Sequence, residues 1–155
     1  MRFKNFQIWR GRLPHWRADE VRYYTTFRHR RPLDEDERRT LFAHLLRASG
    51  NRYDVFVLCV LPEVTELMFR MREDAKGRPF ELAAIIEGAK RKAGKAIVKD
   101  TGERYPPFYT ESYDRIVRDD AEFEERWLAI VGSPVDAELA DEPEDYECLW
   151  VAPEP

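Results

Sequence analysis

Residues 53–71 have the sequence YDVFVLCVLPEVTELMFRM, and this stretch decides the fold of the chain. Its first part, up to Leu61, is an almost continuous apolar run, which is typical of a central strand covered on both sides. Pro62 ends that run, and from Val64 to Met71 the residues alternate between the two sides of a second strand. Because the connection between them is short, we expect the two strands to be antiparallel neighbours.

The segments on either side of this pair alternate between strands and helices. Residues 21–28 are rich in β-branched and aromatic side chains and predict a strand. A helix should follow, with Asp34 as its N-cap, Glu37 close to a capping-box position and Gly50 closing its C-terminus. Further along we expect a helix at 79–95, a strand at 112–118 and a helix at 120–131.

This order predicts an α+β fold. The first six elements are those of a ferredoxin-like β-α-β-β-α-β sandwich, a four-stranded antiparallel sheet with helices on one face, and an extra C-terminal helix follows them. We expect a basic aromatic N-terminal arm at 1–19, an α+β domain at 20–133 and a mostly irregular acidic tail at 134–155. Many unrelated functions use this architecture, so the fold class does not decide the function.

Composition sets further bounds. The chain has 155 residues, of which 43% are hydrophobic and 13% aromatic, as expected of one folded domain. No apolar run is long enough to span a membrane and the N-terminus lacks the apolar region of a secretory signal, so we expect a cytoplasmic protein without a membrane partner. Cys59 and Cys148 stand alone, without the spacing of a zinc site or a disulfide framework.

Charge is segregated along the chain, although the net charge is only −4. Residues 1–31 hold nine Lys and Arg against two acids, whereas residues 134–155 hold eight acids and no Lys or Arg. Either one end binds a polyanion or both ends are simply solvated. In the arm, bases and aromatics alternate as in proteins that stack on nucleic acid, although the arm could equally pack on its own domain. The candidate nucleic-acid contacts there are Arg10, Arg12, Trp16 and Arg17.

The second predicted helix becomes cationic toward its end. Its candidate DNA contacts are Lys90, Arg91, Lys92 and Lys95. The alternative interpretation of these four residues is a solvated helix end.

Four short stretches occur in order between residues 13 and 150. They are LPHWR and YYTTFR (13–17 and 23–28), VLCVLP (57–62), ESYDRIVRD (111–119), and SPVDAEL with EPEDY (133–139 and 142–146). Together they resemble the REP-associated tyrosine transposases, a branch of the single-tyrosine HUH transposases of small bacterial insertion sequences. The resemblance implies a protein that cleaves and joins DNA strands through a phosphotyrosine, with Mg²⁺ or Mn²⁺ as its cofactor.

The resemblance breaks at the metal site. In the family, two histidines two residues apart face the same side of a strand and bind the divalent ion that polarises the scissile phosphate. The equivalent residues here are Val64 and Glu66. Valine cannot ligate a metal, and the single carboxylate of Glu66 is a poor site. We therefore expect no metal cofactor, with Glu66 either a vestigial ligand or a solvated or salt-bridged side chain.

The resemblance also breaks at the nucleophile, which in the family is a tyrosine on the second helix. Counting back from Phe108 and Tyr109 places it near Lys92 and Ala93, and no tyrosine occurs between Tyr53 and Tyr105. Losing either the metal or the nucleophile costs several orders of magnitude in rate, so we expect no strand cleavage. We expect the later tyrosines to pack on the sheet or its loops: Tyr105, Tyr109 and Tyr113.

Three functions stay open. The first is a catalytically inactive transposase-like protein that retains binding of hairpin or single-stranded DNA, although Asp136 and Glu138 replace an arginine and a glycine of the family. The second is a protein-interaction or homodimerisation module without nucleic-acid binding. The third is a new enzyme in the old cleft, for which His15 and His29 are weak candidates because no catalytic motif accompanies them.

Overall fold

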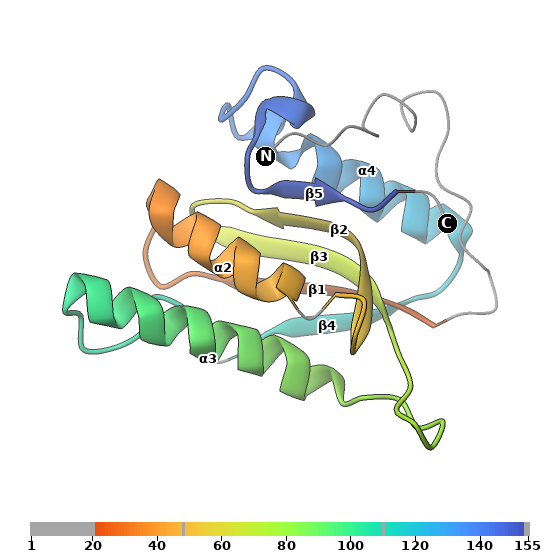
Figure 1. Cartoon of the computed structure of the whole chain (residues 1–155). Coiled ribbons are helices and arrows are strands. Elements are labelled where there is room, and N and C mark those ends of the chain that lie inside the picture. Colours follow the sequence, from red (N-terminus) through yellow and green to blue (C-terminus); the bar gives the residue numbers. More distant parts are fainter. Residues whose placement is uncertain (1–20, 48, 110, 154–155) are drawn as a thin grey trace.

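The computed structural model describes residues 21–47, 49–109 and 111–153 (Figure 1). It is an α+β structure, and the element order predicted from the sequence is confirmed as far as the third helix. In chain order the elements are β1 (Arg22–Arg28), α2 (Glu35–Arg47), β2 (Tyr53–Val60), β3 (Val64–Met71), α3 (Leu82–Thr101), β4 (Tyr113–Val117), α4 (Asp120–Asp136), the 3-10 helix η1 (Pro143–Asp145) and β5 (Leu149–Val151).

The sheet has five strands in the order β4-β1-β3-β2-β5, and all neighbours are antiparallel. The first four form the expected ferredoxin-like arrangement. The expectation of four strands is one short, and the segment expected to be an irregular tail supplies the fifth. Leu149 pairs opposite Cys59, and the side chains of Leu149 and Val151 are fully buried. A three-residue strand is too short to give a periodic signal, which is why the sequence pattern missed it.

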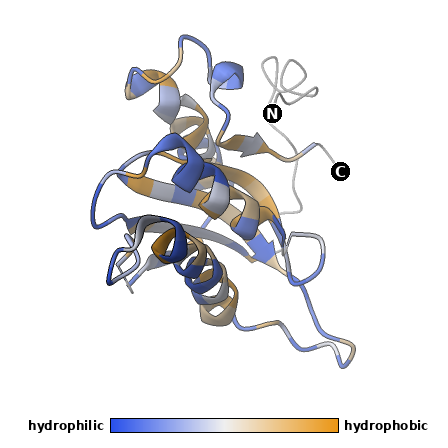
Figure 2. Ribbon diagram, turned by 60° about the vertical axis from the view of Figure 1, so that its left-hand side comes forward, coloured by the Kyte–Doolittle hydropathy of each residue, from blue (hydrophilic) through white to orange (hydrophobic). Residues whose placement is uncertain are grey.

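Helices cover the sheet on both faces. Figure 1 shows α2 and α3 side by side over one face, whereas α4 lies on the other face, against β2 and β5. Figure 2 shows apolar colouring concentrated in the sheet and polar colouring on the outward sides of the helices. The central strand β2 is buried almost along its whole length, as its apolar run predicted. No helix in the described ranges is long and apolar enough to cross a membrane.

The capping box at the start of α2 forms as predicted. The backbone N–H of Glu37 donates to Asp34 Oδ1 at 2.8 Å, and the N–H of Asp34 donates back to Glu37 Oε1 at 3.0 Å. These reciprocal bonds satisfy two of the N–H groups that a helix start leaves without partners.

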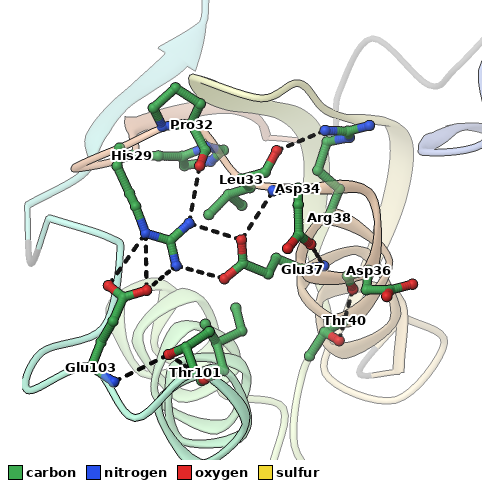
Figure 3. A network of polar contacts seen from close by, with 12 residues as sticks. His29, Pro32, Leu33, Asp34, Asp36, Glu37, Arg38, Thr40, Thr101 and Glu103 are labelled. Carbon is green, nitrogen blue, oxygen red and sulfur yellow. Dashed lines mark hydrogen bonds and ion pairs between the residues drawn. The ribbon is translucent and has the colours of Figure 1, made fainter.

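An ion-pair network fastens this helix start to the segment just after α3 (Figure 3). The guanidinium of Arg31 donates to both carboxylate oxygens of Glu37, at 2.8 and 2.6 Å, and also to the carboxylate of Glu103. Arg31 lowers the pKa of the Glu37 carboxyl, whose side chain is nearly buried. Because Glu37 is also a member of the capping box, the network fixes the start of α2 relative to the segment after α3.

Both later helices run beyond their predicted ends. In α3 the buried positions Ala89, Ala93 and Ile97 continue a spacing of four residues, and Gly102 closes the helix with a φ of 75°. In α4 the helix passes through Pro134, which cannot donate to the carbonyl of Ile130. The hydroxyl of Ser133 donates to that carbonyl at 2.7 Å, so the carbonyl keeps a partner and the helix continues.

Two glycines of α3 have opposite surroundings. A Cβ at Gly94 would lie 2.8 Å from Cβ of Pro106, whereas a Cβ at Gly88 would meet nothing within 4 Å. Gly94 therefore lets the connection after α3 approach the helix closely.

We predict that Gly94→Ala lowers the free energy of unfolding by about 1–3 kcal/mol, because the rigid ring of Pro106 must shift. Gly88→Ala is the matched control and should raise it by up to about 1 kcal/mol through helix propensity. Urea unfolding followed by circular dichroism measures both. Equal effects of the two substitutions would contradict the close approach at Gly94.

Candidate nucleic-acid interface

The alternation of β3 places Val64 and Glu66, the positions compared with the family's metal ligands, on the α4 side of the sheet. Tyr24 of β1 donates its hydroxyl to Glu66 Oε2 at 3.0 Å, and the guanidinium of Arg126 in α4 lies 4.3 Å from the centre of the Tyr24 ring. Cys59, which pairs opposite Glu66, lies 3.5 Å from the hydroxyl of Ser133, again in α4. The helix next to the Val64 and Glu66 positions is therefore α4.

The positions expected for the nucleophile lie on the other side of the sheet. Ala93 is fully buried on the inner side of α3, and Lys92 is exposed beside His44 of α2. The structure therefore does not bring Lys92 and Ala93 together with Val64 and Glu66. Counting along a sequence gives a place on a helix but not the face of the sheet that the helix covers. The conclusion about tyrosine is unaffected, because none of the helices in the described segments contains one.

An open depression of about 650 Å³ lies over Val64 and Glu66. Tyr109 and Tyr113 stand at its rim, with exposed fractions of 49% and 55%. Tyr105 is similarly exposed, at 54%, so none of the three tyrosines expected to pack on the sheet or its loops is buried. The other residues that line the depression are Tyr24, Thr26, Phe27, Arg28, Glu111 and Ser112.

The chemistry of the depression does not fit the family's reaction. Burial, followed by the charge of Glu66, raises the pKa of Tyr24 to about 12, so its phenol stays protonated and donates to Glu66. A divalent ion would find one carboxylate there, already engaged by Tyr24, beside the alkyl side chain of Val64. No cluster of three or more His, Cys, Asp or Glu side chains suited to a metal ion occurs in the part of the chain that the structure describes.

The rim of the depression continues as a row of exposed tyrosines and arginines beside the end of β1. The guanidinium of Arg30 lies 5.5 Å from the centre of the Tyr105 ring, and that of Arg104 lies 5.3 Å from the same ring. All six members of the row are exposed. We call it the tyrosine–arginine track: Tyr113, Tyr109, Arg28, Arg30, Tyr105 and Arg104.

Backbone contacts hold the track in place. The N–H of Arg30 donates to the carbonyl of Pro107 at 2.6 Å, and a β-bridge joins His29 to Phe108. The segment before β4 therefore runs along the end of β1, with Phe108 buried and Tyr109 exposed. The sequence pattern missed this arrangement because a connection with two prolines gives no periodicity. The spacing of four between the three tyrosines was the only available signal.

The cations that the sequence predicted as DNA contacts differ in their exposure to solvent. Lys90 is buried, donates to Ser112 Oγ at 3.2 Å and lies 4.4 Å from the centre of the Phe27 ring, so it is not available to DNA. Its prediction as a contact is corrected, because a lysine on the inner side of a helix can extend toward polar groups at a sheet edge. Arg91, Lys92 and Lys95 are exposed. Four candidates lie outside the described residues: Arg10, Arg12, Trp16 and Arg17.

His29 does not face the depression over Val64 and Glu66. It is buried on the α3 side, where Nδ1 lies 2.8 Å from the carbonyl oxygen of Pro62 and Nε2 lies 2.8 Å from Thr65 Oγ1. In the neutral ring Nδ1–H donates to Pro62, and Nε2 accepts from Thr65. Burial lowers the pKa of His29 to about 4, from an ordinary value of 6.5. His29 is therefore a structural residue that holds the Pro62 turn and the start of β3.

We predict that this histidine makes stability depend on pH. Between pH 6.5 and 4 the unfolded chain binds a proton at His29 that the folded chain excludes, so stability falls as the pH falls, by about 3 kcal/mol in total. His29→Gln keeps a donor and an acceptor but cannot titrate, and it should flatten the dependence of Tm on pH between 5 and 7.5. His44→Gln is the control and should leave most of the slope. An unchanged slope in His29→Gln would rule out the assignment.

Comparison with known proteins gives matches in structure alone. No protein-family model matches the sequence, and no curated protein matches it. Among solved structures, a REP-associated tyrosine transposase bound to a REP hairpin matches with a TM-score of 0.58 and 13% identity, over 86% of this chain and 77% of that chain. The chain has the fold of a REP-associated tyrosine transposase. The resemblance inferred from the four sequence stretches is thereby confirmed at the level of the fold.

A second solved structure also matches, with a TM-score of 0.45 and 13% identity. It is of a Deinococcus radiodurans R1 protein that is described as a transposase by inference. The match covers 74% of this chain and 92% of that one.

Proposed function

We propose that this chain is a transposase-like protein that binds single-stranded or hairpin DNA without cleaving it. The observation that carries the proposal is the tyrosine–arginine track, in which three exposed tyrosine rings and three exposed guanidinium groups lie together beside the end of β1. Aromatic rings stack on unpaired bases, and arginines neutralise the phosphates beside them. The solved transposase of the same fold is bound to a REP hairpin, which supports a hairpin as the DNA form.

The second part of the proposal is that cleavage is absent and that binding needs no divalent ion. It is supported by the protonated phenol of Tyr24, by the engagement of Glu66 and by the lack of tyrosine on the described helices. Such a protein would act in the compartment that holds the DNA, which agrees with the cytoplasmic location expected from the sequence.

Homodimerisation is a second proposal, and it rests on β4. Within the described residues this strand pairs with β1 alone, and Ile116 on it is 57% exposed. An edge strand with an exposed apolar side chain can pair with a second copy. Light scattering at high protein concentration tests it, and a monomer under those conditions would reject it.

The stacking role of the track is tested by Tyr109→Ala and Tyr113→Ala. Each substitution should weaken binding to a single-stranded oligonucleotide by roughly 5- to 150-fold, the effect of about 1–3 kcal/mol for one stacked base. Ile116→Ala is the matched control, because Ile116 is equally exposed on the opposite face of the same strand, and it should bind as the parent chain does. Fluorescence anisotropy measures the affinities. If both tyrosine variants bind the oligonucleotide with the affinity of the parent chain, the track is not the binding site for unpaired bases.

The three arginines of the track predict a dependence on salt. If Arg28, Arg30 and Arg104 each contact one phosphate, the logarithm of the affinity should fall with the logarithm of salt concentration at a slope of about −2. Replacing all three with glutamine should bring the slope close to zero. A parent-like slope in the triple variant would place the phosphate contacts elsewhere.

The absence of cleavage is tested with end-labelled hairpin DNA in Mn²⁺ or Mg²⁺. We expect no shortened strand and no protein–DNA adduct on a denaturing gel, because Tyr24 stays protonated and no metal cluster occurs among the described residues. An adduct would overturn this part of the proposal, and its loss in Tyr24→Phe would assign the nucleophile.

A further inference from the structure

A separate pocket of about 200 Å³ lies between the end of α2 and the middle of α3, across the sheet from the tyrosine–arginine track. Its floor is formed by small and apolar residues of α3, and a Cβ at Gly88 would meet nothing within 4 Å. Space above the helix is therefore open. The polar side chains that line it come from α2, the turn after it and α3: His44, Arg47, Asn51, Arg52 and Lys92.

The charge in this pocket is of one sign. No carboxylate lines it, and Arg47, Arg52 and Lys92 form no ion pair with any carboxylate of the described residues. Nη1 of Arg47 lies 3.4 Å from Nδ1 of His44 and can donate to it only when that nitrogen is unprotonated. Burial, followed by the charges of Arg47 and Lys92, lowers the pKa of His44. The positive charges in the pocket therefore repel one another, and no carboxylate that lines the pocket offsets this repulsion. A bound anion would reduce it.

The helix dipole does not account for the whole group. His44 and Arg47 lie in the last turn of α2, where positive charge is favourable. Arg52 lies beyond that helix, and Lys92 lies in the middle of α3, where no helix end attracts a cation. A pocket that collects side chains from three segments is better explained by an anion that they share.

We propose that this pocket binds a phosphate group through Arg47, Arg52 and Lys92, with Asn51 as a further donor. Arginine and lysine are the usual phosphate ligands, and the volume leaves room for one phosphate and the group attached to it. The phosphate belongs either to a nucleic acid or to a small phosphorylated molecule. The pocket shares no residue with the tyrosine–arginine track and does not depend on the proposed function.

The first test uses inorganic phosphate as the probe and the His44 ring as the reporter. In NMR titrations at constant ionic strength, phosphate should shift the His44 resonances saturably and raise the pKa of His44, whereas chloride should not. A phosphate response that is linear and equal to that of chloride would overturn the proposal.

Two double variants separate a site from general surface charge. Arg47→Gln with Lys92→Gln should weaken phosphate binding by about tenfold or more, because two charged hydrogen-bond donors are lost. Arg91→Gln with Lys95→Gln removes the same charge from exposed positions on α3 that do not line the pocket, and it should leave binding unchanged. Equal losses in the two variants would mean that the helix attracts anions without a site, and the proposal would fail.

Gly88→Leu should block the pocket without removing any of its charged side chains. The new side chain would occupy the open space above the helix, so phosphate binding should be lost while circular dichroism and Tm stay close to those of the parent. Retained binding in this folded variant would contradict the pocket as the location.

The source of the phosphate is decided by competition with a 5′-phosphorylated oligonucleotide and its 5′-hydroxyl counterpart. Displacement of either oligonucleotide by inorganic phosphate in the parent chain, but not in Arg47→Gln with Lys92→Gln, assigns the pocket to a nucleic-acid phosphate. Saturable phosphate binding that leaves both oligonucleotides in place assigns it to a small phosphorylated molecule. Loss of the track tyrosines should leave phosphate binding unchanged in either case, so failure of this site and failure of the proposed function can be told apart.

Discussion

The covering of the sheet on both faces is the constraint on which the rest of the structure depends. Because neighbouring residues of β3 point to opposite sides, Thr65 meets His29 on the side of α2 and α3, while Glu66 meets Tyr24 on the side of α4. The side of α2 and α3 is a core that contains a neutral histidine. The other side is open beside α4 and carries polar groups. A shift of one residue in the register of β3 would exchange these two roles and lose both sets of contacts.

The sequence predicted the elements whose signals are local. The bounds of β3 agree with the alternation of its residues, and the capping box of Asp34 and Glu37 formed as its spacing predicted. Tertiary contacts determined what the pattern could not. Pro134 stays helical because Ser133 supplies a hydrogen bond to the freed carbonyl, and Leu149 forms a strand because β2 offers it an edge. Counting along the sequence placed Lys92 and Ala93 on a helix, but it could not indicate which face of the sheet that helix covers.

Under the proposed function, catalysis and binding would differ in their tolerance to sequence change. Catalysis needs a metal and a nucleophile held within a narrow geometry, and replacement of a single member removes it. Binding of an unpaired strand needs rings and cations spread over a surface, with no single geometry. The phenol of Tyr24 donates to Glu66, and burial together with this contact opposes a phenolate there. The exposed tyrosines and arginines around this contact need no fixed geometry relative to one another. They therefore follow no motif by which the sequence could have identified them.

The pairing of β5 with β2 has a consequence for synthesis in the cell. β2 is the most buried strand of the sheet, and β5 comes after every other described element in the chain. Until β5 emerges from the ribosome, the backbone groups of β2 at Val57 and Cys59 have no outer partner, and Tyr146 cannot yet donate to the carbonyl of Val60. An apolar edge left open in this way pairs readily with other chains. A stalled or shortened product that lacks residues 146–151 should therefore aggregate rather than persist as a smaller folded protein.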